Sequence, residues 1–159
     1  MREVLDVKFM RMSIKEAYKN IKKMEGGPFG ACIVKGNKVL ALGHNKVLVS
    51  DATAHAEIVA IREASRKLKT FDLSGTTIYS TTEPCPMCFS AIHWARISRV
   101  VYGTNIADAL KIGFNELGIA NNKMKKLGKS KVKITPGFLR KECLELLREW
   151  ASLEDKRFY

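Results

Sequence analysis

Residues 76–88 read TTIYSTTEPCPMC, and this stretch predicts a strand that leads directly into a helix. The β-branched run at 76–81 is typical of a strand. A helix is expected to open near Pro86, because proline is favoured in a first helical turn. Cys85 and Cys88 then lie on one face of that turn, near N–H groups and a helix dipole that lower the pKa of thiols. The stretch therefore predicts a cation site at the junction of a strand and a helix.

The rest of the chain predicts helices and strands that alternate around this junction. Apolar residues at helical spacing predict a helix over 6–24, which the run at 26–28, Gly-Gly-Pro, ends. Residues 29–34 and 39–42 predict two strands joined by a tight turn. We further expect helices at 54–68, 86–95 and 138–150, strands at 99–102 and around 132–134, a less regular stretch at 104–127, and a tail at 151–159. A hairpin followed by alternating helices and strands predicts an α/β fold, in which helices cover the faces of a mixed sheet.

Length and composition are those of one globular domain. The 159 residues and the apolar fraction of 46% predict a single domain over 1–159. No run of about 18 apolar residues is present, which argues against a membrane span or a membrane partner. The first residues lack the apolar block of a signal peptide, so we expect a cytoplasmic protein. Cys32 and Cys143 lie in apolar patterns and are expected to be buried thiols rather than disulfide partners.

The net charge of +12 favours polyanions as partners. Much of this excess lies at residues 121–133, which contain Lys123, Lys125, Lys126, Lys129, Lys131 and Lys133. One interpretation is a solvated, mobile, lysine-rich loop. The other is a patch that binds RNA. We favour the first interpretation and keep RNA as an alternative partner.

Two thiolates do not complete a tetrahedral zinc site, so a third protein ligand is needed. Of three histidines, His55 lies at the start of a predicted helix, two residues before Glu57. In a first helical turn the two side chains can flank one ion, with His55 as a ligand and Glu57 beside it. One His and two Cys leave the fourth position open, where zinc makes a water molecule acidic near neutral pH. Glu57 can then accept that proton and pass it on.

An isolated Cys-x-x-Cys pair has two other interpretations. A redox pair is typical of a thioredoxin-like context, and a structural zinc site needs two more Cys or His at short spacing. Neither pattern is present in this sequence. The residues therefore favour one catalytic zinc ion per chain, held by His55, Cys85 and Cys88.

The motifs His-Ala-Glu at 55–57 and Pro-Cys-Pro-Met-Cys at 84–88 resemble the signature of the cytidine deaminase superfamily, zinc enzymes that remove amino groups from nucleobases. The resemblance covers roughly residues 14–116, with further similarity at the tail. It implies zinc as cofactor and a three-layer α/β/α cytidine deaminase-like fold with a five-stranded mixed sheet. It says little about the substrate.

Within the superfamily, the chain is most similar to the bacterial guanine deaminases. The segments that carry this resemblance are 26–31, 43–45, 51–57, 83–88, 94–96, 108–109, 113–116 and 156–159. In that family a second carboxylate lies near the base, and a C-terminal aromatic residue reaches the active site of a partner subunit in a swapped dimer. By position these roles fall on Glu116, where Asp is common, and on Tyr159. The resemblance thus implies a homodimer, in which the tail at 151–159 is the candidate for exchange.

The residues around these motifs suit a flat base. Phe29 and Trp94 can pack on the faces of a base, and Asn45 offers a donor and an acceptor to its edge. The resemblance adds Ala56 and Tyr159 to this candidate substrate-binding set. Phe29 is equally well explained as a core residue, and Trp94 and the terminal aromatic residues as packing groups.

Together these residues predict hydrolytic deamination of a purine base, with guanine giving xanthine and ammonia. Glu57 is expected to carry the protons and Glu116 to share that role. The main rival is a tRNA adenosine deaminase, which residues 96–103 also resemble and which the positive charge favours. Other rivals are a deaminase of guanosine, cytosine or another free base or nucleoside, and a zinc-stabilised RNA-binding module without activity. The presence of Glu57 argues against the last, because a structural zinc site does not need that carboxylate.

Overall fold

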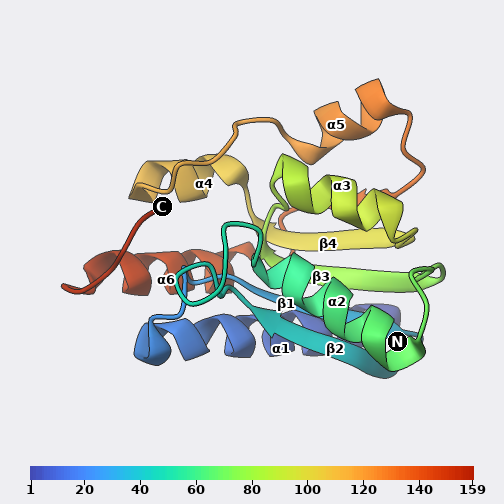
Figure 1. The fold of residues 1–159 in the computed structure, drawn as a ribbon, viewed down its shortest axis with the longest axis horizontal. Helices are drawn as coiled ribbons and strands as arrows, with labels where there is room; N and C mark the ends of the chain where they lie inside the picture. Colours follow the sequence, from blue (N-terminus) through green and yellow to red (C-terminus); the bar gives the residue numbers. More distant parts are fainter.

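A five-stranded mixed sheet lies at the centre of the computed structural model, with helices on its faces (Figure 1). The structure describes residues 1–159, apart from the side chain of residue 2. Along the chain the elements are α1 (Arg2–Lys23), β1 (Gly30–Lys35), β2 (Lys38–His44), α2 (Ala56–Leu68), β3 (Thr76–Thr82), α3 (Pro86–Trp94), β4 (Arg99–Thr104), α4 (Ile106–Ile112), α5 (Asn121–Gly128), β5 (Lys133–Thr135) and α6 (Arg140–Ser152). No helix among the described residues is long and apolar enough to cross a membrane.

The strand order β2-β1-β3-β4-β5 places β3 in the middle of the sheet. β1 runs antiparallel to β2 and to β3, whereas β3, β4 and β5 are parallel to one another. α3 makes the crossover from β3 to β4. Because the carboxyl ends of parallel strands meet at one edge of a sheet, the segments that follow β3 and β4 start from the same edge. Residues 83–88 leave the sheet there.

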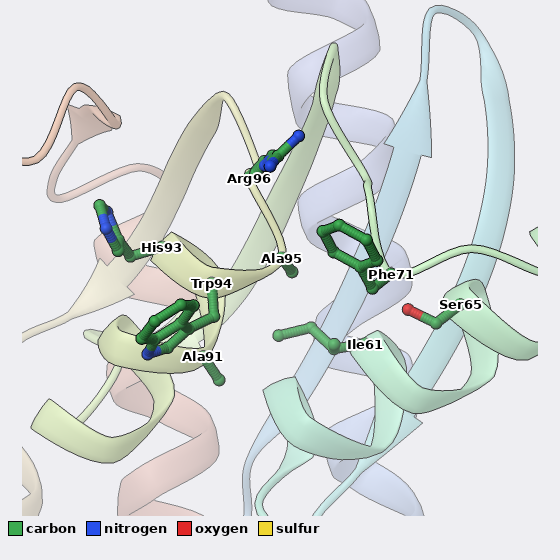
Figure 2. Close-up of a pocket in the computed structure, with 8 residues that line it drawn as sticks. All are labelled: Ile61, Ser65, Phe71, Ala91, His93, Trp94, Ala95 and Arg96. Carbon is green, nitrogen blue, oxygen red and sulfur yellow. The ribbon is translucent and has the colours of Figure 1, made fainter.

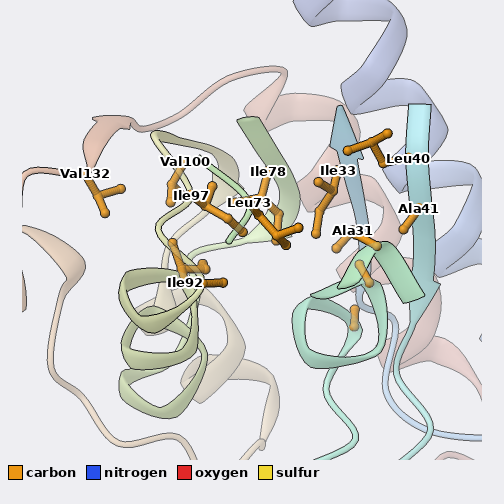
Figure 3. Close-up of a cluster of buried hydrophobic side chains, with 14 of the residues drawn as sticks. Ala31, Ile33, Leu40, Ala41, Leu73, Ile78, Ile92, Ile97, Val100 and Val132 are labelled. Atoms are coloured by element: carbon orange, nitrogen blue, oxygen red, sulfur yellow. The ribbon is translucent and has the colours of Figure 1, made fainter. Parts of the chain in front are cut away.

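α2 and α3 pack against each other on one face of the sheet, and Figure 2 shows Ile61 and Ala91 on these neighbouring helices. Beneath them, Ile33, Ile78 and Val100 come from three neighbouring strands and are fully buried (Figure 3). Burying one such side chain contributes about 1.5–3 kcal/mol. This core therefore fixes both helices on the sheet.

α1 and α6 pack on the opposite face. Cys32 and Tyr79 from the strands and Cys143 from α6 belong to a second buried cluster there. Each of the two strand residues is next to one that faces the α2 and α3 layer, as the alternation of a strand requires. Cys32 and Cys143 are buried free thiols, as expected. Burial raises the pKa of each to about 12, so neither thiol is reactive near neutral pH.

The structure confirms the α/β fold with a five-stranded mixed sheet, and it shifts several predicted boundaries. α1 begins at Arg2 rather than at residue 6. β2 and β4 each continue two residues beyond the predicted end, to His44 and Thr104. α6 ends at Ser152, two residues after the predicted end. The predicted strands and helices that flank the motif at 84–88 are all present.

The expectation of an irregular stretch over 104–127 is wrong, because it contains α4 and most of α5. α4 begins with a capping box formed by Asn105 and Asp108. At the start of α5, the backbone N–H of Asn121 donates to Glu83, and the side-chain amide of Asn121 donates to the carbonyl of Pro84. Such tertiary hydrogen bonds stabilise helices that are too short for a clear periodicity. Residues 121–128 of the lysine-rich segment therefore form α5, and the short loop at 129–132 leads into β5.

The close contact between β2 and α2 predicts that Gly43→Ala destabilises the protein. A Cβ atom at Gly43 would lie 2.5 Å from the carbonyl oxygen of Ala56 and 2.9 Å from the nitrogen of Ala60, both backbone atoms of α2. We expect the free energy of unfolding, measured in urea, to fall by about 1–3 kcal/mol, as is typical of overpacking. Gly128→Ala is the matched control, because a Cβ atom there meets nothing within 4 Å. Equal stability of the two variants would contradict the close approach of α2.

Candidate active site

His55, Cys85 and Cys88 meet where the N-termini of α2 and α3 come together. His55 is the residue before α2, Cys85 is the residue before α3, and Cys88 lies in the first turn of α3. One ligand atom from each of the three residues lies within 4.8 Å of the other two. The structure thus brings together all three ligands that the sequence predicts.

The spacing of these atoms fits zinc. With Zn–N near 2.0 Å and Zn–S near 2.3 Å, two ligands at the tetrahedral angle are about 3.6 Å apart. The distance from Cys85 Sγ to His55 Nδ1 is 3.6 Å. One nitrogen and two sulfur ligands are a typical donor set for a catalytic zinc ion, and they leave a fourth position for water or substrate. The three residues are therefore positioned to hold zinc.

The ligands affect one another's ionisation. The hydrogen bond with Cys88, followed by the contacts with His55, lowers the pKa of Cys85 to about 4 despite burial. The same hydrogen bond, together with burial, raises the pKa of Cys88. Burial lowers the pKa of His55, but the hydrogen bond with Cys85 and the nearby negative charges outweigh it, so the net change is upward. Without a metal, the pair of thiols thus holds one negative charge, whereas zinc takes both as thiolates.

Glu57 lies in the first turn of α2 and is only 6% exposed. Burial raises the pKa of its carboxyl, and the charge of His55 opposes this. Glu57 Oε1 accepts a hydrogen bond from Ser80 Oγ at 2.9 Å, and Glu57 Oε2 lies 3.4 Å from Cys88 Sγ. A buried carboxylate beside the ligands is well placed to take a proton from a bound water and to pass it on.

Ser80 is a site residue that the sequence interpretation missed. It lies in β3, two positions after Ile78, so both side chains point to the α2 layer. A hydroxyl in an inward-facing position of a buried strand needs a hydrogen-bond partner, and Ser80 Oγ has two acceptors within reach, Glu57 Oε1 at 2.9 Å and the carbonyl of Thr82 at 2.7 Å. That polar residue among β-branched neighbours is the signal that was available in the sequence.

Glu116 joins the same site from the loop between α4 and α5. Burial and the charges of Cys85 and Glu57 raise the pKa of Glu116 to about 7, while His55 lowers it. The charges of Cys85 and His55 therefore act on the carboxyl of Glu116, which the sequence predicts near the base. A carboxyl with a pKa near neutrality can both accept and release protons.

The predicted base-binding residues Asn45, Phe29 and Tyr159 form one wall beside these groups. Asn45 is 1% exposed, and its backbone N–H donates to the carbonyl of Phe29. The hydroxyl of Tyr159 accepts a hydrogen bond from the backbone N–H of Gly27 at 3.0 Å and is hydrogen-bonded to the side chain of Asn45. The rings of Phe29 and Tyr159 both pack edge-on against Phe114, at centroid distances of 4.9 and 5.4 Å.

The tail places Tyr159 over the site of its own chain. The backbone N–H of Asn115 donates to the carbonyl of Tyr159. Burial, and to a smaller extent the charges of Glu116 and Glu57, raise the pKa of the Tyr159 phenol. Exchange of this tail with a partner subunit stays a prediction. Ala56, the first residue of α2, is fully buried between His55 and Glu57, so only its backbone faces this region.

The structure does not bring Trp94 to this site. Trp94 is 78% exposed at the C-terminal end of α3, whereas Cys85 and Cys88 are at its N-terminal end. A nine-residue helix separates its two ends by about 12 Å. Trp94 instead lines a surface hollow of about 850 Å³ with Phe71 and Ile61 (Figure 2). As a base-stacking residue of its own chain, Trp94 was predicted wrongly.

Glu83 and Asn121 support the cysteine pair, and sequence reasoning assigned neither residue this role. The buried carboxylate of Glu83 accepts hydrogen bonds from the hydroxyl of Tyr102 and from the backbone N–H groups of Ile106 and Asn121, at 3.3, 3.2 and 2.8 Å. Asn121 also donates to the carbonyl of Pro84 at 2.5 Å. These bonds connect Glu83 and Pro84, which follow β3, to the starts of α4 and α5. They thereby fix the path of the backbone into Cys85.

The ligand geometry predicts one zinc ion per chain, lost in Cys85→Ala. Removing one thiolate leaves an incomplete donor set, so zinc measured by elemental analysis after dialysis should fall to near zero. Cys32→Ala is the matched control, because Cys32 is a buried thiol of the other layer and should leave one zinc ion bound. Retention of zinc by Cys85→Ala with an intact fold would show that the ligand set is different.

Comparison with known proteins agrees with this geometry. Residues 4–104 match the family described as the cytidine and deoxycytidylate deaminase zinc-binding region. The chain is 42% identical over 109 aligned residues to a guanine deaminase of Bacillus subtilis (strain 168). The aligned residues cover 68% of this chain and 70% of the relative. It is 38% identical over 159 residues to a tRNA-specific adenosine deaminase of Buchnera aphidicola subsp. Schizaphis graminum, which covers 99% of this chain and 100% of the relative.

Among solved structures, a guanine deaminase from Nitrosomonas europaea superposes with a TM-score of 0.81 at 32% identity, covering 91% of this chain and 84% of that one. Both the fold and the metal-binding motifs are therefore shared with proteins of known type. The chain belongs to the cytidine and deoxycytidylate deaminase family of zinc-binding proteins, and it is a hydrolytic deaminase of nucleobase or nucleotide amino groups.

Proposed function

We propose that the substrate is free guanine, which the protein converts with water into xanthine and ammonia. The observation that carries this proposal is the position of Tyr159, which lies over the site beside Asn45 and Gly27. A terminal aromatic residue packed against the predicted base-binding residues suits a free base. A base that is still attached to a polynucleotide needs an open path for its sugar and phosphates.

The polar groups of the site suit the edge of guanine. The Asn45 amide offers a donor and an acceptor, although its Oδ1 already accepts the backbone N–H of Val47 at 3.0 Å. Glu116 in its ionised form accepts hydrogen bonds from the ring N–H and from the exocyclic amine. Phe29 supplies an apolar surface for the ring.

Zinc held by His55, Cys85 and Cys88 supplies a Lewis acid that makes a water molecule acidic near neutral pH. Glu57 would carry both protons of that water in turn: it would pass the first to the ring nitrogen, then accept the second from the hydroxyl added to the ring carbon and pass it to the leaving amine. Ser80 holds the Glu57 carboxylate through Oε1, which leaves Oε2 on the side of the ligands. Glu116 shares in the proton transfer.

A second candidate function is the deamination of adenosine in tRNA. The match to the Buchnera tRNA deaminase spans almost the whole chain, and the net charge is +12. Lys129, Lys131, Lys133 and Arg96 line a hollow of about 600 Å³ that has no acidic residue in its lining. Among the described residues, none of these three lysines forms an ion pair. Such a surface suits a phosphate backbone.

A substrate panel separates the two candidates. Ammonia release is measured with guanine, guanosine, adenine, cytosine, cytidine and tRNA, each with the zinc-loaded protein. We expect turnover of guanine that changes little between about 50 and 200 mM salt, since a neutral base releases no counterions, whereas tRNA turnover would fall steeply. Deamination of tRNA without deamination of guanine would overturn the proposal and support the second candidate.

The role of Glu57 predicts that Glu57→Ala keeps zinc and loses activity. Removing a general acid–base group lowers kcat by about 10²–10⁴-fold. Zinc content by elemental analysis and ammonia release by a coupled assay measure the two effects. Glu63→Ala is the control on the same helix, because Glu63 pairs with Arg66 on the exposed face and should leave both quantities unchanged. Full activity of Glu57→Ala would refute the mechanism.

The pKa of Glu116 predicts the pH dependence of kcat/KM. Burial raises this pKa to about 7, so the carboxylate form that accepts hydrogen bonds from guanine is lost as the pH falls through about 7. We expect the acid limb of the profile near that pH, together with lower activity and the absence of this limb in Glu116→Gln. An identical acid limb in wild type and variant would exclude Glu116 as its origin.

A further inference from the structure

A buried histidine that the proposed chemistry does not use lies next to the base-binding wall. His44 is the last residue of β2, and its ring faces the α1 layer. Its Nδ1 is 3.3 Å from Glu16 Oε2, and its Nε2 is 2.5 Å from Glu25 Oε2. The side chains of His44, Glu16 and Glu25 are 9%, 10% and 28% exposed. A ring with a proton on each nitrogen donates to both carboxylates, whereas a neutral ring would turn a lone pair towards one of them.

This contact joins the two loops that form the base-binding wall. Glu25 directly precedes the glycines at 26–27, and His44 directly precedes Asn45. The backbone N–H of Leu48 donates to the carbonyl of Glu25 at 3.0 Å. The backbone N–H of Asn45 donates to the carbonyl of Phe29 at 3.1 Å. The two loops are therefore held together along their length, and the link from His44 to Glu25 is made between side chains.

The loops approach each other closely at Asn45. The side-chain amide of Asn20 donates to the carbonyls of both Gly27 and Asn45, each at 2.8 Å. A Cβ atom at Gly26 would lie 2.0 Å from Asn45 Oδ1, so the backbone of the glycine loop packs directly against the amide of Asn45. A shift of this loop would therefore move the Asn45 amide.

We propose that His44, held between Glu16 and Glu25, is a positioning residue for substrate binding that keeps the glycine loop against Asn45. The same contact keeps the Gly27 N–H in place for the hydroxyl of Tyr159. The inference rests on the proposed function in one respect, which is that Asn45 contacts the base. It does not depend on which base is bound.

Several other charged groups surround the cluster. Lys19 of α1 lies 2.6 Å from Glu16 Oε1 and offsets one of the two carboxylates. Glu16 also acts on Cys32 of β1, whose thiol stays protonated because burial and that charge raise its pKa. The hydrogen bond with His44, and secondarily the charges of Lys23 and Lys46, lower the pKa of Glu25.

The lowered pKa of Glu25 defines the pH range in which its hydrogen bond with His44 stabilises the loop. A carboxyl whose folded pKa is lowered stabilises the folded state above its unfolded pKa, and this contribution is lost as the pH falls through the folded value. We therefore expect this contribution of Glu25 to the loop to be lost as the pH falls through its lowered pKa.

The test is Glu25→Gln, which keeps the shape of the side chain and removes its charge. Loss of a charge-assisted hydrogen bond that orients a binding group should raise KM for the base about tenfold, with kcat within about twofold of the wild type. Zinc content should stay at one ion per chain. Glu63→Gln on the exposed face of α2 is the matched control and should leave KM unchanged. A merely structural role would lower stability without this separation of KM from kcat.

A measurement without substrate keeps this test independent of the proposed function. In labelled protein, the side-chain amide resonance of Asn45 should shift in Glu25→Gln, because the glycine loop packs directly against this amide, and should stay unchanged in Glu63→Gln. If the wild type does not turn over guanine but Glu25→Gln shifts this resonance, the function is wrong and the positioning role stands. An unchanged KM in Glu25→Gln, or an Asn45 resonance that is the same in Glu25→Gln and in the wild type, overturns the inference.

Discussion

The meeting of two helix N-termini is the constraint on which the rest of the site depends. Free N–H groups and the helix dipole give each N-terminus a partial positive charge that attracts anions. The chain places two cysteines and Glu57 there, in the first turns of α3 and α2 or directly before them. Burial raises the pKa values of Glu57 and Glu116, the hydrogen bond with Cys85 raises that of Cys88, and the repulsion between these close anionic groups adds to all three shifts. A divalent cation relieves that repulsion, so the site is built to hold one.

The second half of the chain holds this junction in place and closes it. Glu83 and Asn121 connect the end of β3 to α4 and α5, so the direction of Cys85 is set by residues far along the chain. The loop after α4 brings Glu116 to the ligands, and the tail brings Tyr159 to Asn45. On the other side, α2 packs so closely on β2 that only glycine fits at Gly43. The metal site is thus fixed by contacts from both halves of the molecule.

The sequence predicts the fold and the metal site well because local patterns determine both. A strand followed by a cysteine pair at a helix start, and a histidine two residues before a glutamate at another, each place functional groups on a first turn. The sheet order then brings the two turns together. α4 and α5 were missed because hydrogen bonds to Glu83 and Pro84 stabilise them, and no periodic pattern in eight residues reveals such contacts. Trp94 was misplaced although the predicted helix over 86–95 already puts it at the end far from Cys85 and Cys88.

Substrate choice depends on residues outside the metal site, and here the molecule combines two features. The contact of Tyr159 with Asn45 and Gly27 suits a free base, whereas Lys129, Lys131 and Lys133 suit a polyanion. Both are consistent with one metal chemistry, which needs a zinc ion with an open position beside a buried carboxylate.

X-ray absorption at the zinc edge of the zinc-loaded protein tests that central requirement most directly. The account predicts two sulfur ligands at about 2.3 Å, one imidazole nitrogen and one light oxygen ligand at about 2.0 Å. A fourth ligand from the protein, sulfur or nitrogen, in place of the oxygen would contradict it, because zinc would then be closed to water and purely structural.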